Sequence, residues 1–297
     1  MNAIRTLLHG AIDYAGLFPP ASLDLASAVR SYAEARASDE RWALGRFVIP
    51  AARLAQLADH ARSFLESDAA RPWRIAALAG DNLEADIAAI LRFNEGTRSD
   101  LVVVDTLDLR APSPDSLRAA LALTPAALVR YAELPVTSDP ARPPFVALLQ
   151  RAGAGAKFRT GGVTPDAIPA PDDLLRSLQA VVRAGIPFKC TAGLHHPTRG
   201  RYPLTYALDG PTGVMHGYLN VLLAAAALLQ GEAADVARRI LLEEDTQAFT
   251  CVAGGVEWRD QRFPTPLLRR LRREGMQSFG SCSFREPMDE LTLVSAA

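Results

Sequence analysis

The sequence is poor in several features that would each indicate a particular class of protein. It contains 3 cysteines in 297 residues. Cys190, Cys251 and Cys282 form no CxxC pair, so neither a disulfide framework nor a zinc knuckle is indicated. The longest apolar run, Leu219–Leu229, is about half of the roughly 20 residues that a membrane span needs. The formal net charge is −1, and no basic run suggests a nucleic-acid or anionic membrane partner.

The first residues also lack the pattern of a secretory signal peptide. One arginine precedes an apolar run that His9 and Asp13 soon interrupt. A hydrophobic content of 49% and a charged content of 22% are ordinary for a globular protein with a full core. We therefore expect a cytoplasmic protein whose partner is a small-molecule substrate, anionic or carbonyl-bearing, and not nucleic acid or a membrane. A homo-oligomer, with Leu219–Leu229 as its contact, is left open.

Lysine is almost absent. The chain has 32 Lys and Arg residues together, and two of them, Lys157 and Lys189, are lysines. Because arginine fills the other cationic positions, surface charge does not explain these two. A buried lysine can lose its proton and act as a base or a nucleophile, which arginine cannot do. Each lysine also follows a short apolar run and precedes a loop that contains glycine, so both are candidates for a functional site.

Short apolar runs alternate with amphipathic stretches along the chain, a pattern typical of repeated β–α units. It predicts a (β/α)₈ TIM-type barrel, formed as a single domain over residues 1–297. An open doubly wound sheet is the alternative, although its usual glycine-rich nucleotide-binding turn does not occur here. The expected strands cover residues 12–18, 45–49, 75–78, 101–104, 127–131, 154–159, 187–191 and 279–284. The expected helices between them cover residues 23–36, 51–64, 83–93, 114–123, 144–152 and 172–184.

An insertion of about residues 194–264 is expected before the last strand. It contains two helical stretches, residues 214–229 and 233–243, and a hairpin, residues 248–258, around Gly254-Gly255. A further helix over 265–274 leads to the last strand. The insertion begins directly after the strand that carries Lys189, so it lies near the expected site.

Polar residues gather at the predicted carboxyl ends of the strands, where barrel enzymes carry their active sites. Alternation along each strand places Lys157 with Arg159, and Lys189 with Thr191, on one face. If these faces point inward, two amines converge, and each lowers the pKa of the other. An amine with a pKa near neutrality can form a Schiff base with a carbonyl, or act as a base. The other strand-end candidates are Asp13, Arg46, Asp105, Glu133, Ser281 and Ser283.

Two motifs in this region resemble those of a known family. Lys157-Phe-Arg-Thr-Gly161 resembles the Lys-Thr-Ser-Thr-Gly motif of the deoxyribose-phosphate aldolase family of class I aldolases, and Lys189-Cys-Thr-Ala-Gly193 is similar to that family's Lys-x-Ala-Gly-Gly. The resemblance covers about residues 154–196. It departs at Arg159, where the family has Ser, and it lacks the second glycine after Lys189.

The resemblance implies that Lys157 forms the Schiff base and that Lys189 lowers its pKa. The family also uses an aspartate as a proton relay on an earlier strand, for which Asp105 or Asp100 is the candidate. Over its whole length the chain otherwise resembles a family of uncharacterised bacterial proteins, through Ile12–Pro20 and Phe279–Phe284. That second resemblance implies no activity.

The residues around the lysines allow several interpretations. Arg159 with Thr160, Gly161 and Gly162 could bind a carboxylate or phosphate, or Arg159 could form a salt bridge to Glu133 or Asp105. Asp13 could equally cap a turn. Cys190 and Cys282 are expected to point away from the inward set as small buried side chains.

The histidines His195, His196 and His216 follow the Lys189 strand closely in the sequence. They could bind substrate, transfer protons, hold a metal together with a carboxylate, or stabilise the loop. Adjacent histidines on an extended segment point to opposite sides, so one of His195 and His196 at most is expected at the site.

The function predicted from these residues is that of a lysine-dependent, aldolase-like lyase on a small oxygenated carbonyl compound, with no cofactor and no metal. Lys157 and Lys189 are the catalytic pair, with Glu133 or Asp105 moving the proton. The alternative enzyme is an isomerase, dehydratase or hydrolase that uses acid–base chemistry or a divalent metal on His195, His216 or a carboxylate. A third possibility is a barrel that binds a small anion without catalysis.

Overall fold

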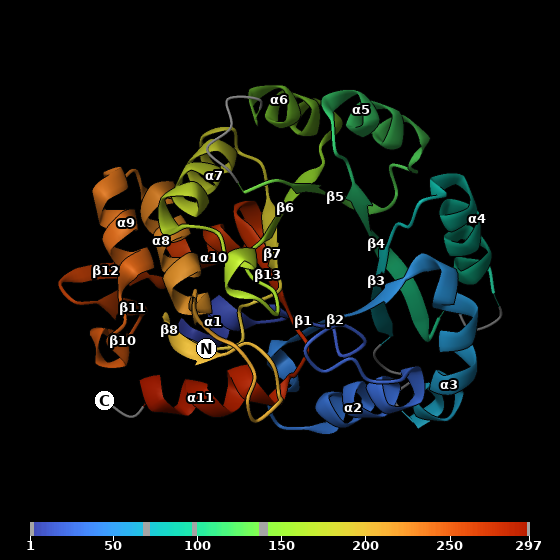
Figure 1. Cartoon of the computed structure of the whole chain (residues 1–297), viewed down its shortest axis with the longest axis horizontal. Coiled ribbons are helices and arrows are strands. Elements are labelled where there is room, and N and C mark those ends of the chain that lie inside the picture. Colours follow the sequence, from blue (N-terminus) through green and yellow to red (C-terminus); the bar gives the residue numbers. More distant parts are fainter. Residues whose placement is uncertain (1–2, 68–71, 97–99, 137–141, 296–297) are drawn as a thin grey trace.

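Eight parallel strands close into a barrel in the order β1-β13-β7-β6-β5-β4-β3-β2 (Figure 1). The computed structural model describes residues 3–67, 72–96, 100–136 and 142–295. Parallel pairing of consecutive strands around a closed ring confirms the predicted (β/α)₈ barrel. The barrel strands are β1 (Ile12–Tyr14), β2 (Leu44–Pro50), β3 (Trp73–Leu78), β4 (Val102–Arg110), β5 (Val129–Leu134), β6 (Gly155–Arg159), β7 (Phe188–Thr191) and β13 (Met276–Ser281).

Helices pack around the outside of the barrel and cover the apolar outer faces of the strands (Figure 1). Ser113 caps the helix that Pro114 starts, because its Oγ accepts a hydrogen bond from the N–H of Ser116 at 3.1 Å. The helices of these units are α2 (Leu25–Ala37), α3 (Leu54–Ser67), α4 (Leu83–Asn94), α5 (Pro114–Leu123), α6 (Arg142–Ala152) and α7 (Pro171–Arg183); α1 (Ala3–Leu8) precedes β1.

Strand β4 is longer than its apolar run predicted. The sequence indicated an end near Asp105, but the strand continues to Arg110. The β3–β4 register shifts between Ile75 and Ala76, whose partners are Val104 and Thr106. Asp105 is therefore an extra residue in the ladder, the arrangement of a β-bulge. The extension carries Asp108 to the interior of the barrel.

The insertion between β7 and β13 contains two small sheets and two helices, gathered at one side of the barrel (orange in Figure 1). The helix expected over 214–229 begins only at Tyr218, because residues 212–215 pair with the segment after β7 instead. The expected hairpin has a third strand. The elements are β8 (Gly200–Pro203), β9 (Thr212–Met215), α8 (Tyr218–Gln230), α9 (Ala234–Leu242), β10 (Phe249–Val252), β11 (Gly255–Trp258) and β12 (Gln261–Pro264), followed by α10 (Thr265–Glu274).

Helix α8 is apolar around most of its circumference, since Tyr218 through Ala227 are all buried. It is 13 residues long and packs against α7, α9 and α10. Across the described parts of the chain, no helix combines the length and the apolar character needed to span a membrane. After β13 the chain ends in α11 (Arg285–Ser295), which the sequence did not predict.

Candidate functional site

Lys157 and Lys189 lie side by side on neighbouring strands. In the parallel register between β6 and β7, Lys157 is the direct partner of Lys189, and Glu133 on β5 is the direct partner of Lys157. Both lysine side chains are buried, with exposed fractions of 7% and 5%. The alternation along the strands thus brings both amines into the barrel interior, where the sequence placed them.

One carboxylate joins the two amines. Asp108 on β4 lies with its Oδ2 at 3.2 Å from Nζ of Lys157 and its Oδ1 at 2.6 Å from Nζ of Lys189. The Asp108 side chain is 3% exposed. A buried carboxylate needs compensating charge, and here two ammonium groups supply it. Asp108 therefore compensates part of the charge of each buried lysine, and the two lysines compensate the charge of Asp108.

Glu133 extends this network toward solvent. Its Oε2 is 3.1 Å from Nζ of Lys157, and its Oε1 accepts a hydrogen bond from Nε of Arg159 at 3.2 Å. Arg159 is 53% exposed and Glu133 26%. The salt bridge from Arg159 to Glu133, one of the two alternatives for this arginine, is therefore present. Arg159 still offers its remaining guanidinium N–H groups at the mouth of the site.

On the other side, Lys189 faces Asp13 and an aromatic ring. Nζ of Lys189 lies 3.9 Å from Oδ2 of Asp13 and 4.9 Å from the centre of the Tyr131 ring. The carboxylate of Asp13 accepts hydrogen bonds from the hydroxyl of Ser278 at 2.7 Å and from the backbone N–H of Arg46 at 2.9 Å. Asp13 is thus a fixed, buried part of the site and not a surface turn cap.

The charges around Lys157 decide its protonation. Burial alone would lower the pKa of Lys157, but the carboxylates of Asp108 and Glu133 outweigh burial and raise the pKa above its ordinary value. Burial would likewise raise the pKa of Asp108 and Glu133, but the neighbouring cations hold both below their ordinary values. The expected lowering of the pKa of Lys157 is thus reversed, because the prediction considered the second lysine and not the carboxylate between them.

A cavity of about 360 Å³ opens over this network. Its size lies within the range typical of small-ligand sites. Of the residues predicted for the site, those that line it are Asp13, Glu133, Lys157, Arg159, Gly162, Lys189, Thr191 and His195; Asp108, Arg110, Cys190 and Cys282 line it as well. The cavity places two amines, three carboxylates and an exposed guanidinium within reach of one small molecule.

The glycines of the two lysine motifs allow their loops to pack together. A Cβ on Gly161 would lie 2.8 Å from Cα of Gly193, and a Cβ on Gly193 would lie 2.8 Å from Cα of Gly161. Gly193 also has a φ of +79°, which L-residues rarely adopt. Thr160 adds a hydrogen bond from its hydroxyl to the carbonyl of Ala192 at 2.6 Å. These glycines and Thr160 therefore fix the distance between the two strand ends that carry the lysines.

Eight of the predicted residues do not line the cavity, and four of these eight have structural partners elsewhere. Asp105, at the bulge of β4, forms ion pairs with Arg46 and Arg74. Nε2 of His216 donates to the carbonyl of Pro169 at 2.9 Å, which fixes the insertion to the loop after β6. His196 contacts Glu290 and stacks on a tyrosine ring of β8. Asp105, Arg46, His196 and His216 thus have structural partners of their own.

Asp108 is not among the site residues predicted from the sequence, because the sequence predicts that the fourth strand ends before this position. A signal existed: Thr106, Asp108 and Arg110 alternate with Leu107 and Leu109, the period-2 pattern of a strand. The apolar run Leu101–Val104 instead predicts a short buried strand that ends at Asp105. Because Asp105 is a bulge residue, one strand includes both the apolar run before it and the alternating residues after it.

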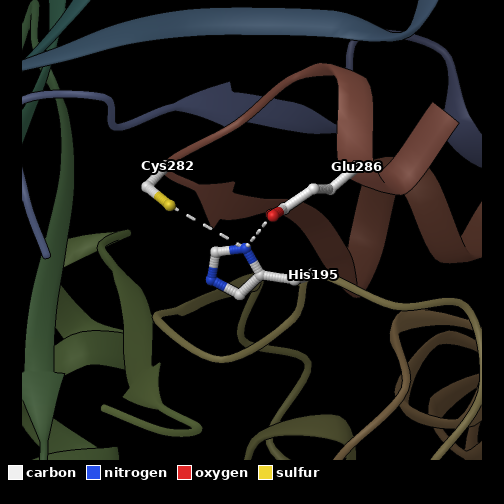
Figure 2. Close-up of side chains that lie close together, drawn as sticks. All are labelled: His195, Cys282 and Glu286. Carbon is white, nitrogen blue, oxygen red and sulfur yellow. Dashed lines mark hydrogen bonds and ion pairs between the residues drawn. The ribbon is translucent and has the colours of Figure 1, made fainter. Parts of the chain in front are cut away.

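Figure 2 shows a second cluster, formed by His195, Cys282 and Glu286. His195 and Cys282 also line the cavity. Nδ1 of His195 lies 2.9 Å from Oε2 of Glu286, 3.3 Å from Oγ of Ser281 and 3.9 Å from Sγ of Cys282. Burial would lower the pKa of His195, but its contacts with Cys282 and Glu286 raise the pKa to about 9. Ser283 supports the cluster by accepting a hydrogen bond from the N–H of Glu286 at 3.2 Å.

The cluster also corrects the expected direction of Cys282, which lines the cavity and does not turn away from it. Ser281, two residues before Ser283, is buried beside His195. The adjacent histidines do diverge as expected: His195 joins this cluster, and His196 faces Glu290. The alternative of a metal on His195, His216 or a carboxylate does not bring His216 into this cluster, because His216 contacts Pro169.

Comparisons with known proteins identify no family. No protein-family profile and no curated protein sequence matches the chain. Among solved structures, the chain is similar to the lysine/ornithine decarboxylase complexed with cadaverine from Vibrio vulnificus, at 14% identity and a TM-score of 0.38. The likeness covers 64% of this chain and 49% of the decarboxylase, so the match spans about half the length of that protein.

Proposed function

We propose that the chain is a lysine-dependent lyase of the aldolase type that acts on a small oxygenated carbonyl compound. The observation that carries the proposal is the contact of one buried carboxylate, Asp108, with the amines of both Lys157 and Lys189, all three of which line the cavity. Two buried amines and a shared carboxylate provide a nucleophile, a cation beside it and a group that moves the proton between them.

In the proposed reaction, the Lys157 ammonium first gives a proton to Asp108 or Glu133, which lie 3.2 and 3.1 Å from Nζ, and the neutral amine attacks the carbonyl carbon of the substrate. The substrate oxygen takes one proton from the attacking nitrogen and the other back from the carboxyl group, and it leaves as water. The iminium accepts the electron pair of the carbon–carbon bond that breaks, while the hydroxyl group of the departing fragment loses its proton and becomes a carbonyl. The enamine that remains is protonated on carbon, and water hydrolyses the iminium to release the second product and Lys157. Lys189 stabilises the charge that develops on the substrate oxygen. Asp108 takes the aspartate relay position that the aldolase resemblance implies, in place of Asp105 or Asp100.

Arg159 and Arg110 give the cavity its preference for an anionic substrate. Both line the cavity and have exposed side chains, and Arg159 uses its Nε for Glu133. A carboxylate or phosphate at the far end of the substrate can pair with guanidinium N–H groups there. The loop Thr160-Gly161-Gly162, by contrast, is used mainly to pack the lysine strands together.

The test is reductive trapping. Untagged protein is incubated with a panel of small hydroxylated aldehydes, ketones and 2-keto acids and then treated with sodium borohydride, and the labelled peptide is identified by mass spectrometry. We expect one label per chain on Lys157. Lys157→Arg should lose the label, whereas Lys189→Arg, which keeps a cation, should retain it at a reduced rate. A compound that turns over without labelling either lysine would contradict the imine mechanism.

The raised pKa of Lys157 favours a second candidate, in which both lysines act as cations. An isomerase or dehydratase could use the Lys157 ammonium as a general acid and Glu133 or Asp108 as a base. That enzyme would turn over its substrate without any borohydride label. A barrel that only binds an anion would tolerate both Lys→Arg variants with little change in affinity, so the same variants separate all three functions.

A further inference from the structure

The cluster of His195, Cys282 and Glu286 has the donor set of a metal site. An imidazole nitrogen, a thiol sulfur and a carboxylate oxygen all lie within 4.8 Å of one another. They come from three different elements: the loop after β7, the end of β13 and the first turn of α11. Figure 2 shows the three side chains pointing toward a common centre. Along the chain, His195 is 87 residues from Cys282 and 91 residues from Glu286, and the barrel fold brings the three together.

A catalytic triad would arrange these groups differently. In a Cys–His–acid triad, the nucleophile contacts one ring nitrogen and the acid contacts the other. Here the carboxylate of Glu286 and the thiol of Cys282 both approach Nδ1 of His195, at 2.9 and 3.9 Å. A single nitrogen has either one proton or one lone pair, so at most one of these contacts is a well-formed hydrogen bond, and the 3.9 Å contact with Cys282 is the weaker one. Convergence on one point is what a cation between the three atoms requires.

The distances are close to those of a bound ion. Around a tetrahedral zinc ion, with bonds of roughly 2.0–2.3 Å, neighbouring ligand atoms are roughly 3.4–3.6 Å apart. The nitrogen–oxygen and nitrogen–sulfur distances of 2.9 and 3.9 Å lie on either side of this value. All three ligand atoms lie within 4.8 Å of one another, so side-chain rotations about a bound ion would have to close the remaining difference. The hydroxyl of Tyr206, 3.4 Å from Sγ of Cys282, completes the polar surroundings.

We propose that His195, Cys282 and Glu286 bind one divalent transition-metal ion, of which zinc is the best match. The thiolate and imidazole exclude calcium and magnesium, which require oxygen ligands. Three protein ligands leave a fourth position for water or a substrate oxygen, the composition typical of a catalytic zinc site. His195 and Cys282 also line the cavity that contains Lys157 and Lys189, so a molecule in the cavity could reach the ion.

The chain contains a matched control for this site. His196 contacts Glu290 at 2.8 Å, in the same way as His195 contacts Glu286, but among the described residues that second pair belongs to no group of three possible metal ligands. Glu290 lies four residues after Glu286 on α11. Substitutions of His196 and Glu290 therefore remove the same types of side chain from the same two elements without touching the proposed ligands.

The experiment measures metal binding directly and does not depend on the proposed lysine chemistry. Reduced, untagged protein is stripped with a chelator and titrated with Co²⁺, whose thiolate charge-transfer absorption reports a sulfur ligand, and then with Zn²⁺ in competition. We expect one ion per chain and a charge-transfer band that Zn²⁺ abolishes. Mg²⁺ and Ca²⁺ should not compete.

The variants then assign the ligands. Cys282→Ser should remove the charge-transfer band, and His195→Gln and Glu286→Gln should each weaken binding by at least the roughly 10- to 100-fold that loss of an outer-shell partner costs. Cys251→Ser, His196→Gln and Glu290→Gln should bind as the unchanged protein does. Absence of stoichiometric binding in the unchanged protein, or equal binding by Cys282→Ser, would overturn the proposal. Borohydride labelling of Lys157 would be scored separately, so either proposal can fail alone.

Discussion

Lys157 lies directly opposite Lys189 in the register between β6 and β7, and both ammonium groups are buried. Like charges at neighbouring positions of a sheet repel one another. The barrel resolves this by extending β4 to Asp108, whose two carboxylate oxygens contact one amine each. Asp108 is therefore the carboxylate that the two lysines share, while Glu133 and Asp13 each lie near one of them.

Removing the charge of Asp108 should make Lys157 a better nucleophile at neutral pH. Asp108 and Glu133 hold the pKa of Lys157 above its ordinary value, so its labelling by a reactive aldehyde and cyanoborohydride should keep rising with pH up to at least about pH 10.4. In Asp108→Asn the profile should move to lower pH, with labelling at pH 7 about tenfold faster for each unit by which the pKa falls. Peptide mass spectrometry of the labelled protein across pH 6–10 checks this.

Turnover should respond in the opposite direction. If Asp108 relays the proton, Asp108→Asn labels faster with a generic aldehyde but turns over the true substrate about 10²–10⁴-fold more slowly, the range typical of general acid–base catalysis. Glu133→Gln should shift the labelling profile in the same direction, since Glu133 also raises the pKa of Lys157. A profile in Asp108→Asn that coincides with that of the unchanged protein would show that Asp108 does not set the pKa of Lys157.

Complete removal of the Asp108 side chain should destabilise the barrel. Asp108→Ala leaves two buried ammonium groups without their shared partner, and breaking a buried ion pair in this way costs about 3–5 kcal/mol in the free energy of unfolding. Urea denaturation at pH 7 measures it. Adding Lys189→Met should recover part of the loss, because one uncompensated charge disappears. If Lys189→Met destabilises Asp108→Ala as much as it destabilises the unchanged protein, the two residues are not energetically coupled.

The sequence was sufficient to predict the barrel and the inward position of the lysines, because strand alternation is a local property. Asp108 was also within reach, since Thr106, Asp108 and Arg110 alternate with leucines. The pKa of Lys157 was not predictable in this way, because its sign depends on carboxylates from β4 and β5. Those contacts follow from the closure and register of the barrel, which no local pattern specifies.

The cluster around His195 also depends on contacts that no local sequence pattern specifies. His195 was a candidate from its place after β7, but Glu286 lies on α11, for which no helix was expected. Cys282 was expected to point away, because alternation was extended past Ser281, where β13 ends. Beyond the end of a strand the period-2 pattern no longer applies, and side-chain direction follows the loop. The structure was therefore needed to bring these three residues together.

The acid stability of the protein should depend on Glu133. Burial would raise the pKa of Glu133, but Lys157 and Arg159 lower it below its ordinary value. A carboxyl group with a lowered folded-state pKa adds stability above its unfolded pKa, about 4.3, and loses that contribution as the pH falls through the folded pKa. Glu133→Gln should therefore be less stable than the unchanged protein at pH 7, and the difference should shrink below about pH 4.

Urea denaturation of both proteins between pH 7 and pH 3 measures this difference. Glu95→Gln, at an exposed position after α4, is the control and should differ little from the unchanged protein across the range. A gap between Glu133→Gln and the unchanged protein that stays constant down to pH 3 would mean that the charge of Glu133 contributes nothing to stability.

The contact between the two motif glycines should be required for the site as well as for stability. Gly193→Ala adds a Cβ at 2.8 Å from Cα of Gly161, at a φ of +79°. Gly185→Ala, just before β7, adds a Cβ at a φ of +65° with nothing within 4 Å. Both should lose about 1–2 kcal/mol for the left-handed backbone, and Gly193→Ala should lose more, because the loops after β6 and β7 must move apart. That movement separates the strand ends that hold Lys157 and Lys189, so Gly193→Ala should also slow borohydride trapping, whereas Gly185→Ala should not. Thermal unfolding and the trapping rate of the two variants check this. If both variants lose the same stability and keep the same trapping rate, the positive φ of Gly193 explains the requirement for glycine and the contact with Gly161 does not.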